Sequence, residues 1–280
     1  MRIDLHTHSN ISDGTQSPRQ LIKSAAAAHL DVVALTDHDS TLGWEEATLQ
    51  SLASGVALVR GAEISATHNG VSVHLLSYLH DPQHAGLVSQ NEHVQRARSD
   101  RARHMVDLLS RDFPLDWQSV MAQTVAGTTI GRPHLADALV ACGAVVDRTE
   151  AFETILRPGS AYYVPHYAPA ALEAISNIRA AGGVAVFAHP GANARGRVVP
   201  DAVIGAMREA GLQGLEVDHR DNPPEQRGRL RQLAQEFDLL VTGSSDYHGD
   251  GKPNRLGENI TTPEVFAQIE ELGQLEVIRP

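Results

Sequence analysis

Residues 1–14 read MRIDLHTHSNISDG, and this stretch decides how the rest of the chain is interpreted. A short apolar alternation ends in His6-Thr7-His8, and Asp13 follows after a polar turn. Side chains two apart in a strand point to the same face, so His6 and His8 would project together from one strand end. Such a cluster is typical of metal ligands, although an isolated His-x-His pair also fits ordinary strand-end histidines. The rest of the sequence shows which of these two interpretations, metal ligands or ordinary strand-end histidines, is favoured.

The same order of apolar run, polar residues and helical pattern recurs along the chain. Seven strand-like runs can be counted: RIDLH, DVVALTDHD, VALVRGAEI, VSVHLLSY, GGVAVFAHPG, GLQGLEVDH and LLVTGSSDYH. Near-continuous apolar strands separated by helices predict a parallel sheet covered by helices. We therefore expect an α/β protein with a distorted TIM-like (β/α)7 barrel. Its first helices are expected at Pro18–His29, after a Ser17 cap, and at Leu42–Ala53.

Residues 87–165 interrupt this order with a series of helical patterns. The first is NEHVQRARSDRARHMVDLLSR and the last is TEAFETIL. We expect residues 87–165 to form a helical insertion that roofs the active site. The barrel is then expected to comprise residues 1–86 and 166–280. The many arginines of the first inserted helix are typical of a solvated helix face.

Composition limits the possible classes of protein. Of the 280 residues, 42% are hydrophobic and 20% are charged, as expected for a globular domain. The formal net charge of -11 argues against binding of duplex nucleic acid, which requires an extended basic surface. No apolar run approaches the ~20 residues that span a bilayer, and no apolar leader precedes the first histidine. We expect a cytoplasmic protein with no membrane contact and no obligate protein partner.

Histidines and carboxylates gather where the predicted strands end, which in a (β/α) barrel is the reactive carboxyl face. His74 is expected within the fourth strand, and the residues expected at strand ends are His6, His8, Asp13, Asp37, His38, Asp39, Glu63, His189, Asp246 and His248. So many ligand groups on one rim would be untenable without cations, and they exceed what one ion can use. Mixed nitrogen and oxygen ligands suit Mn, Fe or Zn. We expect two to three divalent ions, with Mn as the first choice and Fe or Zn as alternatives.

The motifs HTHSNISDG, TDHDS, GAEI, AHPG and GSSDYHG, with the histidine of the fourth strand, resemble the ordered motifs of the PHP (polymerase and histidinol phosphatase) family of metal-dependent phosphoesterases. The resemblance implies three ions, held by His6, His8, Glu63 and Asp246; by Glu63, His74 and His189; and by Asp13, His38 and His248. Asp37 and Asp39 remain as partners that orient imidazoles or cap the following helix. The resemblance also places Glu63, Asp246 and His189 at the catalytic centre.

The insert carries the motifs IGRPHLADAL and AYYVPH, which resemble a subgroup that acts on nucleoside 3′,5′-bisphosphates and RNA 5′ ends. Pro133 suits the start of a helix, so free N–H groups and Arg132 would face one anion. Arg132 and His134 are the predicted phosphate contacts. Arg195 and Arg197 could reach a second phosphate, with a surface role as the alternative. The remaining histidines are expected at surface or structural positions: His29, His68, His80, His84, His93, His104, His166 and His219.

The sequence thus predicts hydrolysis of a phosphate monoester on a nucleotide by a metal-bridging hydroxide. Removal of the 3′-phosphate from nucleoside 3′,5′-bisphosphates is the leading hypothesis. Alternatives within the class are 5′-to-3′ trimming of short RNA and hydrolysis of a histidinol-phosphate-like substrate. A non-catalytic PHP scaffold is a different class, and the complete ligand set argues against it.

Overall fold

The computed structural model describes residues 1–165 and 167–280, and in these residues seven strands form one sheet in sequence order. The strands are β1 (Ile3–Asp4), β2 (Val32–Leu35), β3 (Ala57–His68), β4 (Val71–Tyr78), β5 (Val184–Phe187), β6 (Gly214–Asp218) and β7 (Leu240–Gly243). The two sheet ends meet where the His8 N–H donates to the Tyr247 carbonyl at 2.8 Å. The sheet is therefore a nearly closed barrel, which confirms the expected distorted TIM-like fold.

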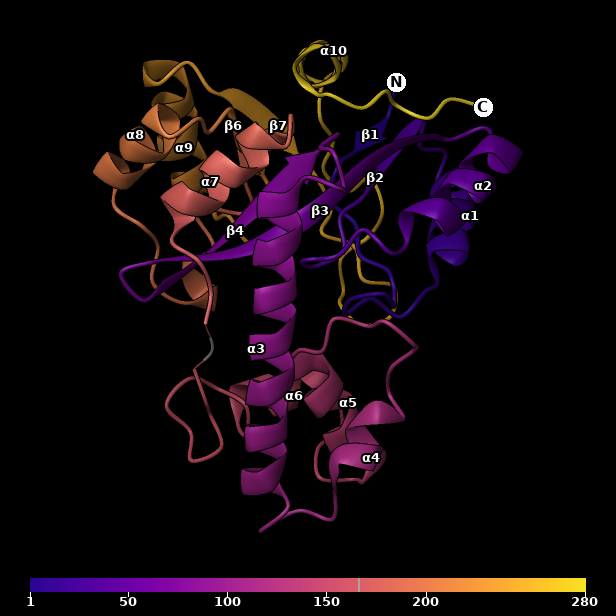
Figure 1. The fold of residues 1–280 in the computed structure, drawn as a ribbon, viewed down its shortest axis with the longest axis vertical. Helices are drawn as coiled ribbons and strands as arrows, with labels where there is room; N and C mark the ends of the chain where they lie inside the picture. Colours follow the sequence, from indigo (N-terminus) through magenta and orange to yellow (C-terminus); the bar gives the residue numbers. More distant parts are fainter. Residues whose placement is uncertain (166) are drawn as a thin grey trace.

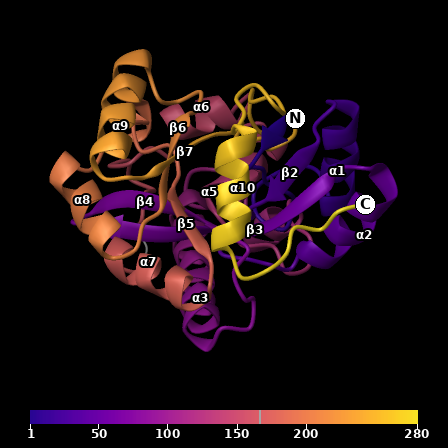
Figure 2. The ribbon, with the colours of Figure 1, turned by 90° about the horizontal axis from the view of Figure 1, so that it is seen from above.

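Helices surround this barrel on its outside (Figure 2). They are α1 (Pro18–Ala27), α2 (Trp44–Ser54), α7 (Ala171–Ala180), α8 (Asp201–Glu209) and α9 (Pro224–Glu236), while α10 (Pro263–Leu272) crosses one barrel end. As expected, Ser17 caps α1 by accepting the Gln20 N–H, and Pro18 opens the helix. The helix ends before His29 because that residue takes a left-handed φ of 56°. Among the described residues, no helix combines the length and apolar character needed to cross a membrane.

Strand β4 departs from the expected parallel arrangement, because it runs antiparallel to both β3 and β5. The cause is local: Asn69 and Gly70 connect β3 to β4 with φ values of 48° and 74°. Two positive φ angles define the tight turn of a hairpin, which reverses the chain at once. His74 lies inside this strand, as expected, and pairs with Ser65 of β3.

Between β4 and α7 the chain forms a separate helical layer on the side of the barrel away from α10 (Figure 1). Its helices are α3 (Ala85–Leu109), α4 (Trp117–Met121), α5 (Arg132–Ala141) and α6 (Arg148–Glu153). They pack around an apolar cluster of their own that includes Leu109, Leu139 and Leu156. The Thr129 N–H donates to the Ile11 carbonyl at 2.8 Å, so this layer is fastened to the loop after β1.

Candidate metal centre

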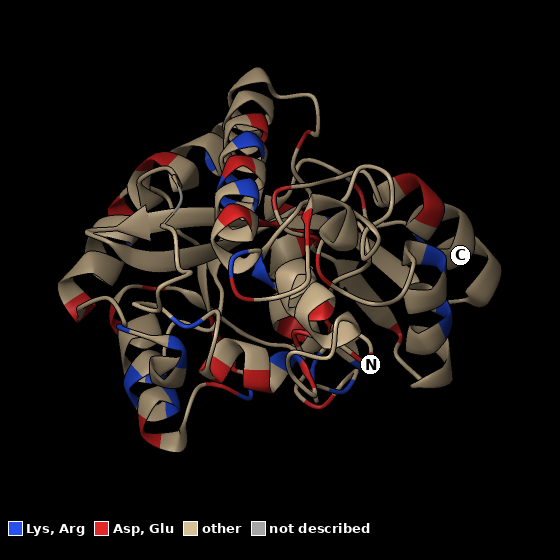
Figure 3. Cartoon of the chain, turned by 90° about the horizontal axis from the view of Figure 1, so that it is seen from below, with Lys and Arg blue, Asp and Glu red and all other residues tan. Residues whose placement is uncertain are grey.

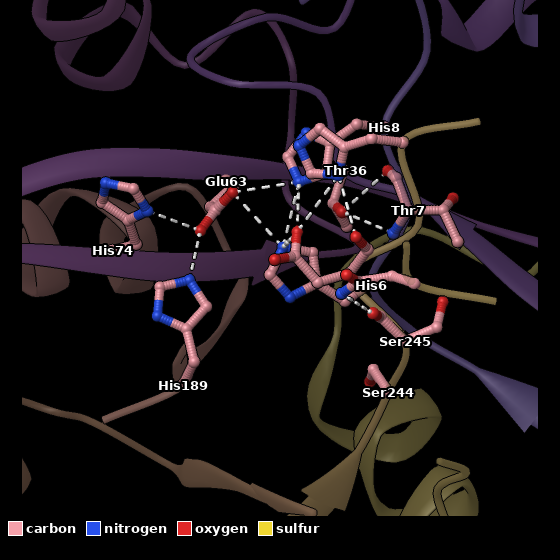
Figure 4. A network of polar contacts seen from close by, with 12 residues as sticks. His6, Thr7, His8, Thr36, Glu63, His74, His189, Ser244 and Ser245 are labelled. Atoms are coloured by element: carbon pink, nitrogen blue, oxygen red, sulfur yellow. Dashed lines mark hydrogen bonds and ion pairs between the residues drawn. The ribbon is translucent and has the colours of Figure 1, made fainter. Parts of the chain in front are cut away.

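Glu63 of β3 lies between two groups of imidazoles (Figure 4). Its Oε1 atom is 2.8 Å from His74 Nδ1 and 3.2 Å from His189 Nε2. Its Oε2 atom is 3.1 Å from His8 Nε2 and 3.3 Å from His6 Nε2. The carboxylate is only 1% exposed. A carboxylate that turns one oxygen to each of two imidazole groups has the arrangement needed to bridge two cations.

Asp246, which follows β7, also has two different sides. Its Oδ1 atom is 3.5 Å from the Nε2 atoms of both His6 and His8. Its Oδ2 atom accepts hydrogen bonds from Arg195 at 2.8 Å and from Lys252 at 3.0 Å. One oxygen is thus available to a cation beside the imidazoles, and the other is occupied by basic side chains.

A third group surrounds Asp13. One carboxylate oxygen is 3.1 Å from His248 Nε2, and the other is 3.7 Å from His38 Nε2. The Nδ1 atom of His38 is also 3.3 Å from Glu63 Oε2, so His38 stands between Asp13 and Glu63. The structure therefore brings all nine predicted ligand residues into one connected cluster, while their division among individual ions stays a prediction.

The donor atoms of this cluster fit divalent ions. Four sets of three residues have ligand atoms within 4.8 Å of one another: His6, His8 and Glu63; His8, Asp13 and His38; His8, Asp246 and His248; His38, Glu63 and His74. In the described part of the chain, His38 Nδ1 and His248 Nε2 are buried without a hydrogen-bond partner. Buried nitrogen atoms that face carboxylates without a proper hydrogen bond are satisfied when a cation lies between them.

The pKa shifts of Glu63 and His189 both favour the form that binds a metal ion. Burial raises the pKa of Glu63, but the imidazoles of His38, His74 and His6 outweigh burial and hold that pKa well below its usual range. Burial, together with the charge of nearby Arg195, lowers the pKa of His189 to about 3. Ionised carboxylates and neutral imidazoles are the forms that bind metal ions.

Two buried residues of the site were missed by the sequence analysis. Glu216 of β6 accepts a hydrogen bond from His6 Nδ1 at 2.9 Å and another from the His189 backbone N–H at 2.8 Å. With the proton on Nδ1, the Nε2 atom of His6 is free to bind a metal. A glutamate inside the apolar run GLEVD was the available signal, because an unpaired carboxylate is not expected there.

His219 was expected at a surface or structural position, and the structure places it at the rim, beside a predicted ligand. The side chain is fully buried, and its Nδ1 atom accepts the Asp221 N–H at 3.0 Å. The neutral ring must then carry its proton on Nε2, which is 3.5 Å from Asp246 Oδ2. His219 thus faces a predicted ligand. His166, another member of that group, lies outside the described residues.

The backbone of the rim is held in unusual conformations. Asp39, His189 and Asp246 have φ values of 51°, 35° and 54°. Such left-handed residues cost about 1–3 kcal/mol each and persist where surrounding contacts hold them, often at functional sites. At Asp39 the holding contacts come from Ser65, whose N–H and Oγ–H each donate to the carboxylate at 2.7 Å.

The predicted phosphate contacts of the insert lie in different surroundings. Arg132, the first residue of α5, donates to the Leu156 carbonyl at 3.2 Å. His134 is only 3% exposed, and its Nδ1 atom accepts the Gly131 N–H at 3.1 Å. His134 therefore caps the start of α5 with one nitrogen, and its contact with a substrate stays a prediction.

The other two predicted contacts follow β5. Arg195, at the end of the short helix η1 (Asn193–Arg195), donates to Asp246 and to Asp221. It therefore lies beside a predicted metal ligand, and its contact with a second phosphate stays a prediction. Arg197 is exposed, and its part in substrate binding stays a prediction.

The barrel and the buried cluster of imidazoles and carboxylates at its rim define a metal-dependent hydrolase. The sequence profile of the PHP domain matches residues 4–123. A 3′,5′-nucleoside bisphosphate phosphatase from Chromobacterium violaceum is 32% identical over 280 residues, which cover 99% of this chain and 98% of that protein. A 5′-3′ exoribonuclease from Haemophilus influenzae is 32% identical over 92% of this chain and 94% of its own length.

Solved structures agree with these relatives. A Bifidobacterium adolescentis protein, assigned provisionally as a metal-dependent phosphoesterase, superposes with a TM-score of 0.96 at 46% identity. The superposition covers 97% of this chain and 96% of that protein. The chain belongs to the PHP family, as its motifs predict, and it is a metal-dependent phosphoesterase.

Proposed function

We propose that this protein removes the 3′-phosphate from nucleoside 3′,5′-bisphosphates, with two to three divalent ions, Mn²⁺ foremost, as cofactors. The observation that carries the proposal is Glu63, whose two oxygens face separate imidazole groups at the rim beneath the insert. Similarity over nearly the whole chain to a bisphosphate phosphatase supports the substrate class.

The roles of the residues follow from their positions. The ligand sets are those implied by the family motifs, with Glu63 shared between two ions. When bound, such ions polarise a phosphate ester and make water nucleophilic near neutral pH. Glu216 keeps the Nε2 atom of His6 unprotonated and holds the backbone of His189. Arg195, which bonds to Asp246 at 2.8 Å, is placed to offset negative charge on a phosphate at the rim.

Trimming of short RNA from its 5′ end is the second candidate. Basic and acidic segments are interspersed on the insert side of the molecule (Figure 3), and this pattern suits a few separate phosphate contacts better than a long duplex. The full-length similarity to an exoribonuclease supports this candidate too.

A substrate panel tests the proposal. Mn-loaded protein is assayed for kcat/KM on adenosine 3′,5′-bisphosphate, 3′-AMP, 5′-AMP, histidinol phosphate and a 5′-phosphorylated trinucleotide. The bisphosphate should give the highest value and yield 5′-AMP. A higher value for histidinol phosphate or for a nucleoside monophosphate would contradict the bisphosphate proposal without affecting the phosphoesterase class.

A further inference from the structure

Four successive carbonyl groups of the loop after β1, at residues 10–13, face the insert. The Thr128 hydroxyl donates to the Asn10 carbonyl at 2.9 Å, and the Thr129 N–H donates to the Ile11 carbonyl at 2.8 Å. Both donors precede α5 in the chain. The insert thus supplies hydrogen-bond donors to a loop that carries part of the metal centre.

The next two carbonyl groups, those of Ser12 and Asp13, contact side chains of α5 and α6. His134 of α5 accepts the Gly131 N–H on Nδ1, so the neutral ring carries its proton on Nε2. Burial lowers the pKa of His134, and a hydrogen bond to the Ser12 carbonyl is among the influences that oppose burial. Arg148 of α6 donates from Nη1 to the Asp13 carbonyl at 3.0 Å. The last of the four contacts therefore holds the backbone of a predicted metal ligand.

Asp137 of α5 fixes the orientation of Arg148. Its two carboxylate oxygens accept from Nε at 2.6 Å and from Nη2 at 2.7 Å, which makes a bidentate pair. Such a pair sets the direction of the whole planar guanidinium group. The Nη1 atom then contacts the backbone carbonyl of Asp13, and the two oxygens of the Asp13 carboxylate face His248 and His38. Arg148 can therefore place Asp13 without competing with a cation for its carboxylate.

Arg148 also lies against the loop after β7. A Cβ atom at Gly251 would overlap the guanidinium group, so the absence of a side chain there makes room for it. The Gly251 N–H donates to the His248 carbonyl at 3.3 Å, and the Thr15 N–H donates to the same carbonyl at 3.0 Å. Arg148 is thus in contact with two loops, and each loop carries a ligand predicted for the same ion.

We propose that Arg148, oriented by Asp137, positions Asp13 and thereby sets the affinity of the metal centre for the ion assigned to Asp13, His38 and His248. This inference rests on the proposed function, which includes that assignment, and deepens it by making the insert a working part of the metal centre. Arg148 is a positioning residue, because it reaches the ion only through Asp13. Residues that orient metal ligands typically change metal affinity 10- to 100-fold when they are replaced.

The test counts bound Mn²⁺ without any substrate. Mn-loaded protein is equilibrated against buffers of decreasing free Mn²⁺, and the ions per chain are measured by elemental analysis. Arg148→Met should lose one ion at about 10- to 100-fold higher free Mn²⁺ than the wild type and keep the others. Gly251→Ala, which displaces the guanidinium group without removing it, should weaken the same ion. Arg103→Met is the control, because Arg103 of the insert is exposed and stacks on Trp117 at 4.0 Å.

Two results would overturn the inference. The first is wild-type retention of every ion in both Arg148→Met and Gly251→Ala. The second is an equal weakening of all ions, which indicates a general disturbance of the fold.

A double-mutant cycle tests whether Arg148 acts through Asp13. Asp13→Asn should weaken the same ion, and adding Arg148→Met to Asp13→Asn should weaken it no further. Additive losses would show that Arg148 acts by another route and would overturn the inference. Wild-type Mn²⁺ retention in Asp13→Asn would overturn the ligand assignment and this inference together. An Asp13-dependent ion that is insensitive to Arg148→Met would overturn this inference alone, and the outcome of the substrate panel affects neither result.

Discussion

The barrel rim and the insert bury charged side chains of opposite sign. The rim buries carboxylates, and the insert buries arginines. At the rim, the carboxylates of Glu63, Asp13 and Asp246 are buried among imidazoles whose lone pairs face them. In the insert, Arg101 and Arg132 are packed without a carboxylate among the described residues. Cations would complete the first region, whereas the second presents positive charge without an acidic partner among the described residues. The two regions therefore differ in the sign of the charge that their buried side chains leave unmatched.

Metal removal should have the largest effect, because the rim is the part that depends on cations. Chelation is expected to abolish phosphoesterase activity, and Mn²⁺ should restore it. Elemental analysis after Mn supplementation should find two to three ions per chain, since nine ligand residues exceed the needs of one. At most one ion per chain would contradict the three-ion assignment.

Glu63→Gln should be the most damaging single substitution at the rim. The amide keeps the shape of the side chain but removes the negative charge that faces both imidazole groups. The activation free energy should rise by several kcal/mol, which lowers kcat on the order of a thousandfold. Glu46→Gln on α2, where the glutamate side chain is 40% exposed, is the control. A Glu63→Gln protein with full metal content and near wild-type kcat would exclude the bridging role.

Glu216→Gln tests whether the rim depends on residues that are not themselves ligands. The neutral amide cannot accept from both His6 Nδ1 and the His189 N–H, so metal affinity should fall about 10- to 100-fold. Asn222→Ala is the matched control, because Asn222 ties the same two segments through Gly191 N–H and the Glu216 carbonyl, at 2.9 Å each. Equal losses of metal affinity, measured by calorimetry, would mean that Glu216 only supports the fold.

The smallest effect is expected at the opposite barrel end, at His80. Burial lowers the pKa of His80 to about 4, so the unfolded chain binds a proton there more readily than the folded protein. Its contribution to stability is therefore complete above pH 6.5 and is lost as the pH falls toward 4, with about 2 kcal/mol lost by pH 5. Urea unfolding of His80→Asn at pH 7.5 and pH 5 should show a smaller decline than the wild type. If the free energy of unfolding declines equally in both proteins, groups other than His80 cause the acid sensitivity.

The strands and the clustering of the candidate ligands could be predicted because their signals are local. Each apolar run is followed within a few residues by its own histidine or carboxylate, as in RIDLHTH and AVFAHPG. The direction of β4 was missed although Asn69-Gly70 marks a hairpin, because the βα rhythm of the neighbouring runs favoured a crossover.

The residues that were missed depend on partners far away in sequence. Glu216 acquires its role only when β6 lies in the same barrel as β1, which brings its carboxylate to His6. The arginines of α3 were placed on a solvated face because one helix alone does not show that α5 packs against it. Burial by another element is a property of the tertiary fold, and a pattern within one segment does not contain it.

The position of the insert has a consequence for synthesis of the chain. β4 pairs with β5, yet the ribosome must add the residues between Tyr78 and Val184 before that pairing can begin. At roughly 5–20 residues per second this takes on the order of 5–20 seconds. Until then, any sheet formed by β1 to β4 has an open strand edge at β4, the kind of surface that pairs with other chains. The insert helices, which have an apolar core of their own, emerge in this interval and can fold beside that edge before the barrel closes.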